Sequence, residues 1–170
     1  MAAERDQVGL TTDEFGTFVA GLDYPMFIVT TVARGRRAGC LVGFTTQASI
    51  DPPRMLVCLS ERNRTFEVAQ AARFLAVHVV EPDQRELAHL FGGESGDDVD
   101  KFARCGWHPG PDGLPLLDDC PRRFVGRVLE SYALGDHSGF LLQPLSEHDG
   151  PSDQALTYQQ VRDVDAGHPA

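Results

Sequence analysis

Three short polar segments have residue types that could bind or position a small molecule. The first is Gly43-Phe44-Thr45-Thr46-Gln47-Ala48-Ser49, called the ledge below, which lies between two strand-like apolar runs. Its small hydroxyl and amide side chains offer hydrogen-bond donors and acceptors, and glycine lets a ligand approach the backbone closely. Asp51-Pro52-Pro53 then ends any helix, because proline lacks an N–H and restricts the residue before it. The pattern predicts a rigid polar ledge between strands.

The second segment joins a strand-like run, residues 54–60, to a short helix expected over 66–72. Its polar residues are Ser60, Arg62, Asn63, Arg64 and Thr65, of which Asn63 or Thr65 would cap the helix. A helix start presents backbone N–H groups and a positive dipole end, so two arginines there could seat a phosphate. Simple capping beside surface charges would explain the same residues, and this segment alone does not decide between the two interpretations.

The third segment is Gly135-Asp136-His137, at the turn of a hairpin that the alternating residues 124–134 and the returning residues 137–145 predict. Taken alone, Asp136 and His137 are most simply turn residues. The chain has no Gly-x-Ser-x-Gly elbow, no recognisable Cys–His nucleophile spacing and no paired carboxylates. This pattern fits a protein that leaves the hard chemistry to a bound cofactor.

Metal binding is not expected from the cysteines and histidines. The four cysteines form no Cys-x-x-Cys pair, and no two histidines have His-x-x-x-His spacing. Cys40 and Cys58 lie in apolar runs, where cysteine usually acts as a small buried hydrophobic residue. His78 lies inside the strand-like run 74–80 and is expected to be a hydrogen-bonded sheet residue.

The elements that must position these segments are mostly strands. Thr11 followed by Glu14, and then apolar residues at helical spacing, predicts an amphipathic first helix that ends near Gly21. Further strands are expected over 26–32 and 38–44, joined by a turn at 34–36, and a capped helix over 85–91. Residues 107–119 are irregular and receive no assignment. About six strands joined mainly by hairpins, with three short helices, favour an antiparallel barrel with peripheral helices.

Composition indicates one domain with a sizeable core. The chain has 170 residues, of which 42% are hydrophobic, and residues 1–170 are expected to form one unit with flexible tails at about 1–10 and 166–170. The net charge of −10 argues against a general nucleic-acid binder, since that affinity comes from clustered Lys and Arg. No signal peptide or run of about 18 apolar residues is present, so a soluble cytoplasmic protein without membrane contact is expected.

The order of these segments resembles the flavin reductase-like family, the FMN-binding split barrels. The resemblance rests on a glycine-bearing strand, the Thr/Ser-rich ledge, Ser49-Ile50-Asp51-Pro52-Pro53 and a Val/Leu strand ending in Ser60. It covers roughly residues 15–147 and includes the strand 25–31, Asn63-Arg64-Thr65, the strand 74–80, the helix 87–91, Lys101-Phe102 and Gly135-Asp136-His137. The family commonly has Asn-Ser-Phe where this chain has Gly43-Phe44-Thr45, which affects side-chain contacts more than backbone contacts.

The resemblance implies a mainly β (α+β) fold, an antiparallel split β-barrel of the FMN-binding type with short peripheral helices. It implies FMN, with FAD as an alternative, held by the ledge and by a phosphate seat at Ser60 and residues 62–65. NADH or NADPH would donate a hydride to the flavin beside the catalytic-site candidates His137 and Asp136, and the reduced flavin would serve a partner monooxygenase. The protein would be a homodimer with flavin sites near the subunit contact.

Two other functions stay open. The protein could be a non-catalytic flavin-binding or electron-transfer protein, or a split-barrel oxidoreductase that uses flavin or a deazaflavin on a specific small substrate. The sequence does not choose between FMN and FAD, or between NADH and NADPH.

Overall fold

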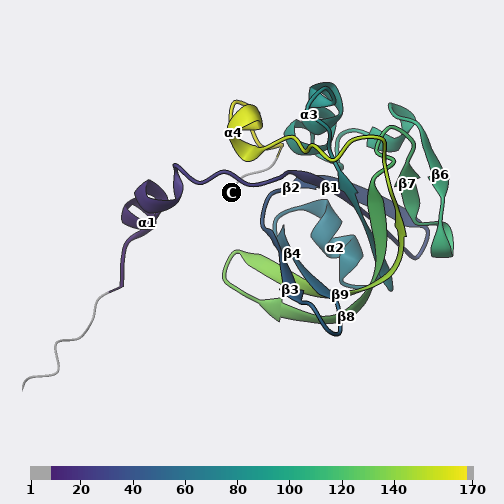
Figure 1. The fold of residues 1–170 in the computed structure, drawn as a ribbon, viewed down its shortest axis with the longest axis horizontal. Helices are drawn as coiled ribbons and strands as arrows, with labels where there is room; N and C mark the ends of the chain where they lie inside the picture. The colour runs from purple at the N-terminus through teal and green to yellow at the C-terminus, as the bar shows by residue number, and fades with distance from the viewer. Residues whose placement is uncertain (1–8, 168–170) are drawn as a thin grey trace, which may run out of the picture.

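The computed structural model describes residues 9–167 and shows a curled antiparallel sheet with short helices around it (Figure 1). The α-helices are α1 (Thr12–Val19), α2 (Arg64–Ala69), α3 (Arg85–Gly93) and α4 (Tyr158–Val161). The strands are β1 (Phe27–Ala33), β2 (Arg36–Val42), β3 (Thr45–Ser49), β4 (Arg54–Ser60), β5 (Phe74–Val79), β6 (Trp107–Pro109), β7 (Pro115–Leu117), β8 (Arg123–Ala133) and β9 (His137–His148). Two 3-10 helices, η1 (Lys101–Ala103) and η2 (Pro111–Gly113), lie around β6.

Seven strands form the main sheet in the order β2-β1-β5-β8-β9-β4-β3, and every pair is antiparallel. The two edge strands β2 and β3 follow one another in the chain, so the sheet curls until its edges approach. Figure 1 shows the strands curled into a ring, and α2 packs against it through contacts with β1, β2 and β4. No ladder joins β2 to β3 in the described part of the chain, and the barrel is therefore split at that seam. The expected mainly β antiparallel fold is confirmed.

The interior of the curled sheet is filled by side chains that alternate along its strands. The strand residues are Val29, Cys40, Val42, Val57, Leu59, Leu75, Val77, Phe140 and Leu142, and Ala69 of α2 packs with them. Because alternate residues of a strand point to opposite faces, the residues between these, such as Leu56 and Leu141, lie on the outer face. A second cluster, which includes Phe91, Phe102 and Val161, packs α3, η1 and α4 against the outside of β1 and β2.

His78 of β5 is a fully buried, hydrogen-bonded sheet residue, as expected. Its Nδ1 lies 3.0 Å from the Ile28 carbonyl oxygen, and its Nε2 accepts a hydrogen bond of 3.1 Å from the Leu117 N–H. Since Nε2 accepts, the proton of the neutral ring is on Nδ1. Burial lowers the pKa of His78 from 6.5 to about 4. This side chain therefore joins β1 and β5 to the β6–β7 hairpin in its neutral form.

Several local expectations are confirmed and others are refined. Thr11 and Glu14 form the capping box that starts α1, but the helix buries no residue. The unassigned residues 107–119 form the β6–β7 hairpin with η2 between its strands. Of the expected flexible tails, residues 1–8 and 168–170 lie outside the described residues, whereas the Gly167 N–H donates to the Gly92 carbonyl at 3.0 Å.

Candidate functional site

The ledge is the edge strand of the sheet together with the link that precedes it. Thr45–Ser49 pairs with β4 on one side only, and Thr46, Gln47 and Ala48 are exposed. The link is tight: a Cβ at Gly43 would lie 2.4 Å from Tyr24 Cε2, so only glycine fits beneath that ring. The ledge therefore presents small polar side chains and an open backbone edge on the outside of the barrel.

The Asp136-His137 turn meets the ledge at one corner of the sheet. The ring of His137 lies 5.2 Å from the ring of Phe44, tilted by 49°. His137 is also the register partner of Ser60, the last residue of β4, and the Glu61 N–H donates to the Asp136 carbonyl at 3.0 Å. We call Phe44, Ser60, Asp136 and His137 the corner.

Asp136 orients the imidazole of His137. Nδ1 of His137 lies 2.7 Å from Oδ1 of Asp136, and because an ionised carboxylate only accepts, Nδ1 carries the proton in this contact. The hydrogen bond from His137 is the main cause that lowers the pKa of Asp136, followed by the charge of His137, and Arg62 contributes in the same direction. The charge of Arg62, at the start of α2, therefore stabilises the ionised carboxylate of Asp136 in the corner.

The start of α2 is capped by Asn63, one of the two expected caps. Its Oδ1 accepts a hydrogen bond of 2.9 Å from the Thr65 N–H, and Ser60 Oγ accepts one of 3.4 Å from the Arg62 N–H. Thr65 itself is buried, with 1% of its surface exposed. Of the five residues expected to seat a phosphate, Thr65 thus faces the interior, whereas Arg62 is exposed and Arg64 is half-buried.

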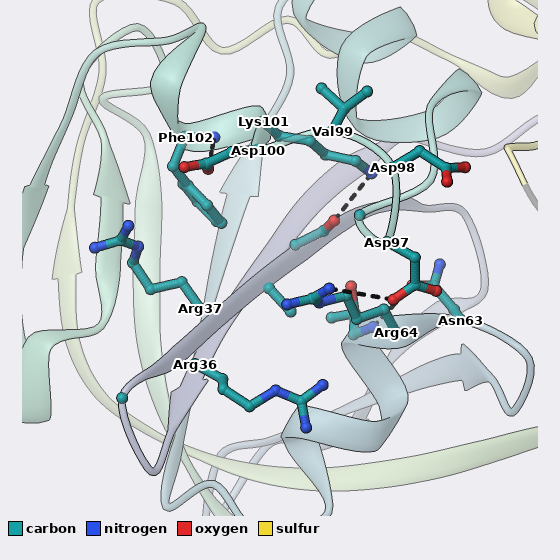
Figure 2. Close-up of a pocket in the computed structure, with 15 residues that line it drawn as sticks. Arg36, Arg37, Asn63, Arg64, Asp97, Asp98, Val99, Asp100, Lys101 and Phe102 are labelled. Carbon is teal, nitrogen blue, oxygen red and sulfur yellow. Dashed lines mark hydrogen bonds and ion pairs between the residues drawn. The ribbon is translucent and has the colours of Figure 1, made fainter.

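Two adjoining cavities open beside this helix start. One, of about 420 Å³, is lined by Arg36, Arg37, Arg64 and Lys101 together with Asp97, Asp98 and Asp100. The other, of about 220 Å³, shares Asn63, Arg64 and Lys101 with it and adds Arg62. Figure 2 shows Arg64 turned toward Asp97, whose Oδ1 lies 3.1 Å from Arg64 Nη1. A carboxylate of the chain thus occupies one side of the guanidinium that could bind a phosphate.

Lys101 fixes the loop that carries these aspartates. It is 5% exposed, and its Nζ donates to the carbonyls of Phe91 at 2.9 Å and Gly39 at 3.2 Å, a contact visible in Figure 2. Burial lowers the pKa of Lys101. Two backbone oxygens hold the ammonium in place, so the acidic loop 97–100 ends at a fixed residue and faces Arg64 across the cavity.

The structure thus brings Phe44, Ser60, Asp136 and His137 together, with Arg62 beside them. It does not place Arg64 and Phe44 along one cavity: within residues 9–167, neither cavity at the start of α2 is lined by Phe44 or His137. Sequence reasoning missed Asp97 and the burial of Lys101, and it favoured a solvated loop over a phosphate contact for the turn that contains Arg36. The acidic composition of residues 94–100 was the one available signal for Asp97, since its partner Arg64 is far away in the chain.

The described residues give no support for a metal centre or a membrane span. Across residues 9–167, no three His, Cys, Asp or Glu side chains are arranged to hold a metal ion. None of the helices in that part of the chain is both long enough and apolar enough to cross a membrane.

Comparison with known proteins identifies the family. The model of the flavin reductase like domain matches residues 19–166, which include the ledge, the start of α2 and the corner. The chain belongs to the flavin reductase-like family. The match spans nearly all the described residues, so the fold and the candidate site lie in the same family domain.

Similar proteins include other members of this family. A "Probable flavin reductase" of Rhizobium meliloti (strain 1021) is 32% identical over 81% of this chain, which spans only 42% of that protein. The protein "FMN reductase (NADH) RutF" of Stutzerimonas stutzeri (strain A1501) is 30% identical, with coverage of 87% of this chain and 90% of that protein. The crystal structure of a flavin reductase domain protein from Arthrobacter sp. FB24 has a TM-score of 0.80 at 18% identity, and it covers 94% of this chain and 96% of that chain. This last likeness concerns the split-barrel fold.

Proposed function

We propose that this flavin reductase-like chain is an NAD(P)H:flavin oxidoreductase that transfers a hydride from NADH or NADPH to bound FMN. The observation that carries the proposal is the corner, where the Asp136-oriented His137 packs against Phe44 of the ledge and pairs in register with Ser60. Catalysis of hydride transfer needs two ligands held close together in a fixed orientation. The ledge, the end of β4 and the β8–β9 turn meet at the corner, and there they could hold two ligands side by side.

The residues present fit a flavin mononucleotide. The ledge offers exposed small side chains and unpaired strand-edge groups for a flat polar ring, and Arg62 and Arg64 could bind its phosphate. An incoming phosphate would replace the carboxylate of Asp97 at Arg64, because both form charge-assisted hydrogen bonds with a guanidinium. FAD, with its additional adenylate, is the alternative cofactor, and the similar RutF protein is named for FMN and NADH.

The flavin would supply the hydride-accepting chemistry, and the residues of the chain would bind and orient it. His137 would act mainly by positioning, because its Nδ1 is held by Asp136 and its ring is packed on Phe44. Phe44 would shield the His137 ring from solvent on one side.

We also propose that the protein acts as a homodimer in the cytoplasm and that the reduced flavin passes to a partner monooxygenase. The flavin site lies on the outer face of β3, β4 and β9, which no element of the described chain covers, and a second subunit would close it.

The direct experiment measures oxidation of NADH and NADPH by the purified protein with and without added FMN, after a visible absorption spectrum has shown whether flavin is retained. The proposal predicts oxidation that depends on both the protein and FMN. Retained flavin without any nicotinamide oxidation would instead support the flavin-binding or electron-transfer alternative. Oxidation that appears only with a further small substrate would support the substrate-specific oxidoreductase.

A further inference from the structure

Helix α1 exposes an apolar stripe that needs a partner. The stripe consists of Phe15 and Phe18 of the helix and Leu22, which follows three residues after its end, and 54%, 72% and 49% of their surfaces are exposed. The two phenylalanine rings stack on each other at 6.0 Å, yet no residue of the helix is buried. Helices shorter than about 12 residues are only marginally stable in water without tertiary packing. An eight-residue helix with this stripe is therefore expected to form against another surface.

The chain holds α1 away from its own body. Gln159 of α4 donates from Nε2 to the carbonyls of Ala20 at 3.1 Å and Leu22 at 2.9 Å, and its N–H donates to Asp23 at 3.0 Å. These three bonds fix the exit of the helix from the body. Figure 1 shows α1 standing clear of the sheet on that side. Within residues 9–167, no element buries a residue of α1.

A second uncovered apolar surface lies on the outer face of β4, β9 and β8. Tyr132 and Leu134 are 44% and 58% exposed, and Leu129 at the bulge of β8 is 39% exposed. Leu134 and Leu56 lie on the same side: a Cβ at Gly139 would be 3.0 Å from one and 3.1 Å from the other. We call Leu56, Leu129, Tyr132 and Leu134 the outer patch. In a lone subunit this sheet face would expose apolar side chains to water.

The elements that carry the two surfaces lie on the same side of the molecule: Figure 1 shows α1 and the light-green tip of the β8–β9 hairpin both at the left of the view. With roughly 100 Å² for each half-exposed Phe, Tyr or Leu, the stripe and the outer patch would bury about 600 Å² per contact. A twofold dimer makes the contact twice, for a total of about 1,200 Å², which reaches the size of a stable interface. Two complementary apolar faces on one chain are what a self-complementary dimer requires.

We propose that the occupant of each outer patch is α1 of a second copy of this chain, so that the two copies exchange their N-terminal helices across a twofold axis. The proposal deepens the homodimer suggested above by naming the elements that join it. Leu134 precedes Asp136 by two residues, so an exchanged α1 would lie at the rim of the corner and cover one side of the candidate site. Each site would then include a wall from the other subunit.

The test measures the dimer dissociation constant by sedimentation equilibrium for the full chain and three variants. Phe15→Ser with Phe18→Ser removes the stripe, Leu134→Asp places a charge in the outer patch, and Thr17→Ala on the opposite side of α1 is the control. Because truncation of a buried aromatic anchor commonly costs about 2 kcal/mol, the first two variants are expected to weaken the dimer at least about a hundredfold. Thr17→Ala is expected to leave the constant unchanged.

A cross-link identifies the contact directly. Phe18→Cys and Leu134→Cys proteins are mixed in equal amounts, allowed to exchange subunits and oxidised mildly, and the linked peptides are identified by mass spectrometry. The proposal predicts a disulfide between positions 18 and 134 of different chains. A monomeric wild-type protein, unchanged dissociation constants in the first two variants, or the absence of this cross-link from a stable dimer would overturn it. Flavin binding and NADH oxidation are measured separately, so failure of the proposed activity is distinguishable from failure of the exchanged helix.

Discussion

The ring of His137 lies 5.2 Å from the ring of Phe44, so the turn between β8 and β9 touches the first side chain of the ledge. His137 follows shortly after the turn glycine Gly135. Phe44 follows Gly43, whose lack of a Cβ lets the chain pass close to the Tyr24 ring. Their contact places a titratable ring, fixed by Asp136, beside an exposed row of small polar side chains. The account of function rests on this relationship.

A bulky side chain on the ledge should block flavin. Thr46→Trp adds volume to the exposed outer face of β3 without disturbing the core, and it is expected to weaken FMN binding by about tenfold or more, which corresponds to about 1.4 kcal/mol. Fluorescence titration with FMN measures the effect. Gln70→Trp, at the exposed far end of α2, is the matched control and should leave the affinity unchanged. If both variants bound FMN with equal affinity, the ledge would not be part of the flavin site.

Loss of the Arg64 guanidinium should weaken binding of the FMN phosphate and leave binding of the flavin ring unchanged. Hydrogen bonds to charged groups contribute about 1.5 to 3 kcal/mol, so Arg64→Ala is expected to weaken FMN by roughly 10- to 100-fold and riboflavin very little. Arg73→Ala is the control, because Arg73 forms a comparable exposed ion pair with Asp112 at 3.3 Å. Equal losses for FMN and riboflavin would show that Arg64 does not contact the phosphate.

Removal of the Asp97 carboxylate, which competes with the phosphate for Arg64, should raise the affinity for FMN. Asp97→Asn keeps the size of the side chain but releases Arg64 from its ion pair, and exposed ion pairs are worth about 0 to 1 kcal/mol. We therefore expect FMN affinity to rise by up to about fivefold, with riboflavin affinity unchanged. Isothermal titration of both ligands measures this. A weaker affinity for FMN would mean that Asp97 supports the site instead of competing for it.

Acidification should destabilise the fold through His78. Its pKa is about 4 in the folded protein, because of burial, and about 6.5 when unfolded, so the unfolded chain binds the proton more readily between these values. The contribution of His78 is fully present above pH 6.5 and is lost as the pH falls toward 4, by about 3 kcal/mol in total. Urea unfolding at pH 7, 6 and 5 measures the decline. A free energy of unfolding that stays constant from pH 7 to 5 would contradict this.

The sequence predicts most of the sheet because local rules dominate there. Alternating residues 124–134, the turn at Gly135 and the β-branched run before Arg34 define hairpins whose partners are adjacent in the chain. The seam between β2 and β3 is different: it depends on how the whole sheet curls, and no local pattern encodes it. The capping box of α1 could be predicted from the sequence. The amphipathic spacing of α1 shows that one face needs a partner surface, but it does not show where that surface lies.

The site was predictable in parts and not as a constellation. Asn63 as a cap and Gly135-Asp136 as a turn follow from residue chemistry. The pairings Phe44 with His137 and Arg64 with Asp97 join segments far apart in sequence, so they depend on sheet order and loop placement. Lys101 would be expected at the surface from its charge alone, and only the carbonyls of Gly39 and Phe91 explain its burial.

The central claim is that His137 positions the nicotinamide beside a flavin held by the rest of the site. Anaerobic stopped-flow spectrophotometry at saturating FMN follows reduction of the bound flavin by NADH or NADPH in the wild type, in His137→Ala and in His108→Ala. The last is a matched control, since His108 forms a similar exposed pair with Asp118 at 2.6 Å on the β6–β7 hairpin. The account predicts that His137→Ala alone slows flavin reduction or raises the KM for the nicotinamide, while the dissociation constant for FMN stays nearly unchanged. A wild-type protein that binds FMN but is not reduced, or a His137→Ala protein with wild-type rates and wild-type KM, would contradict it.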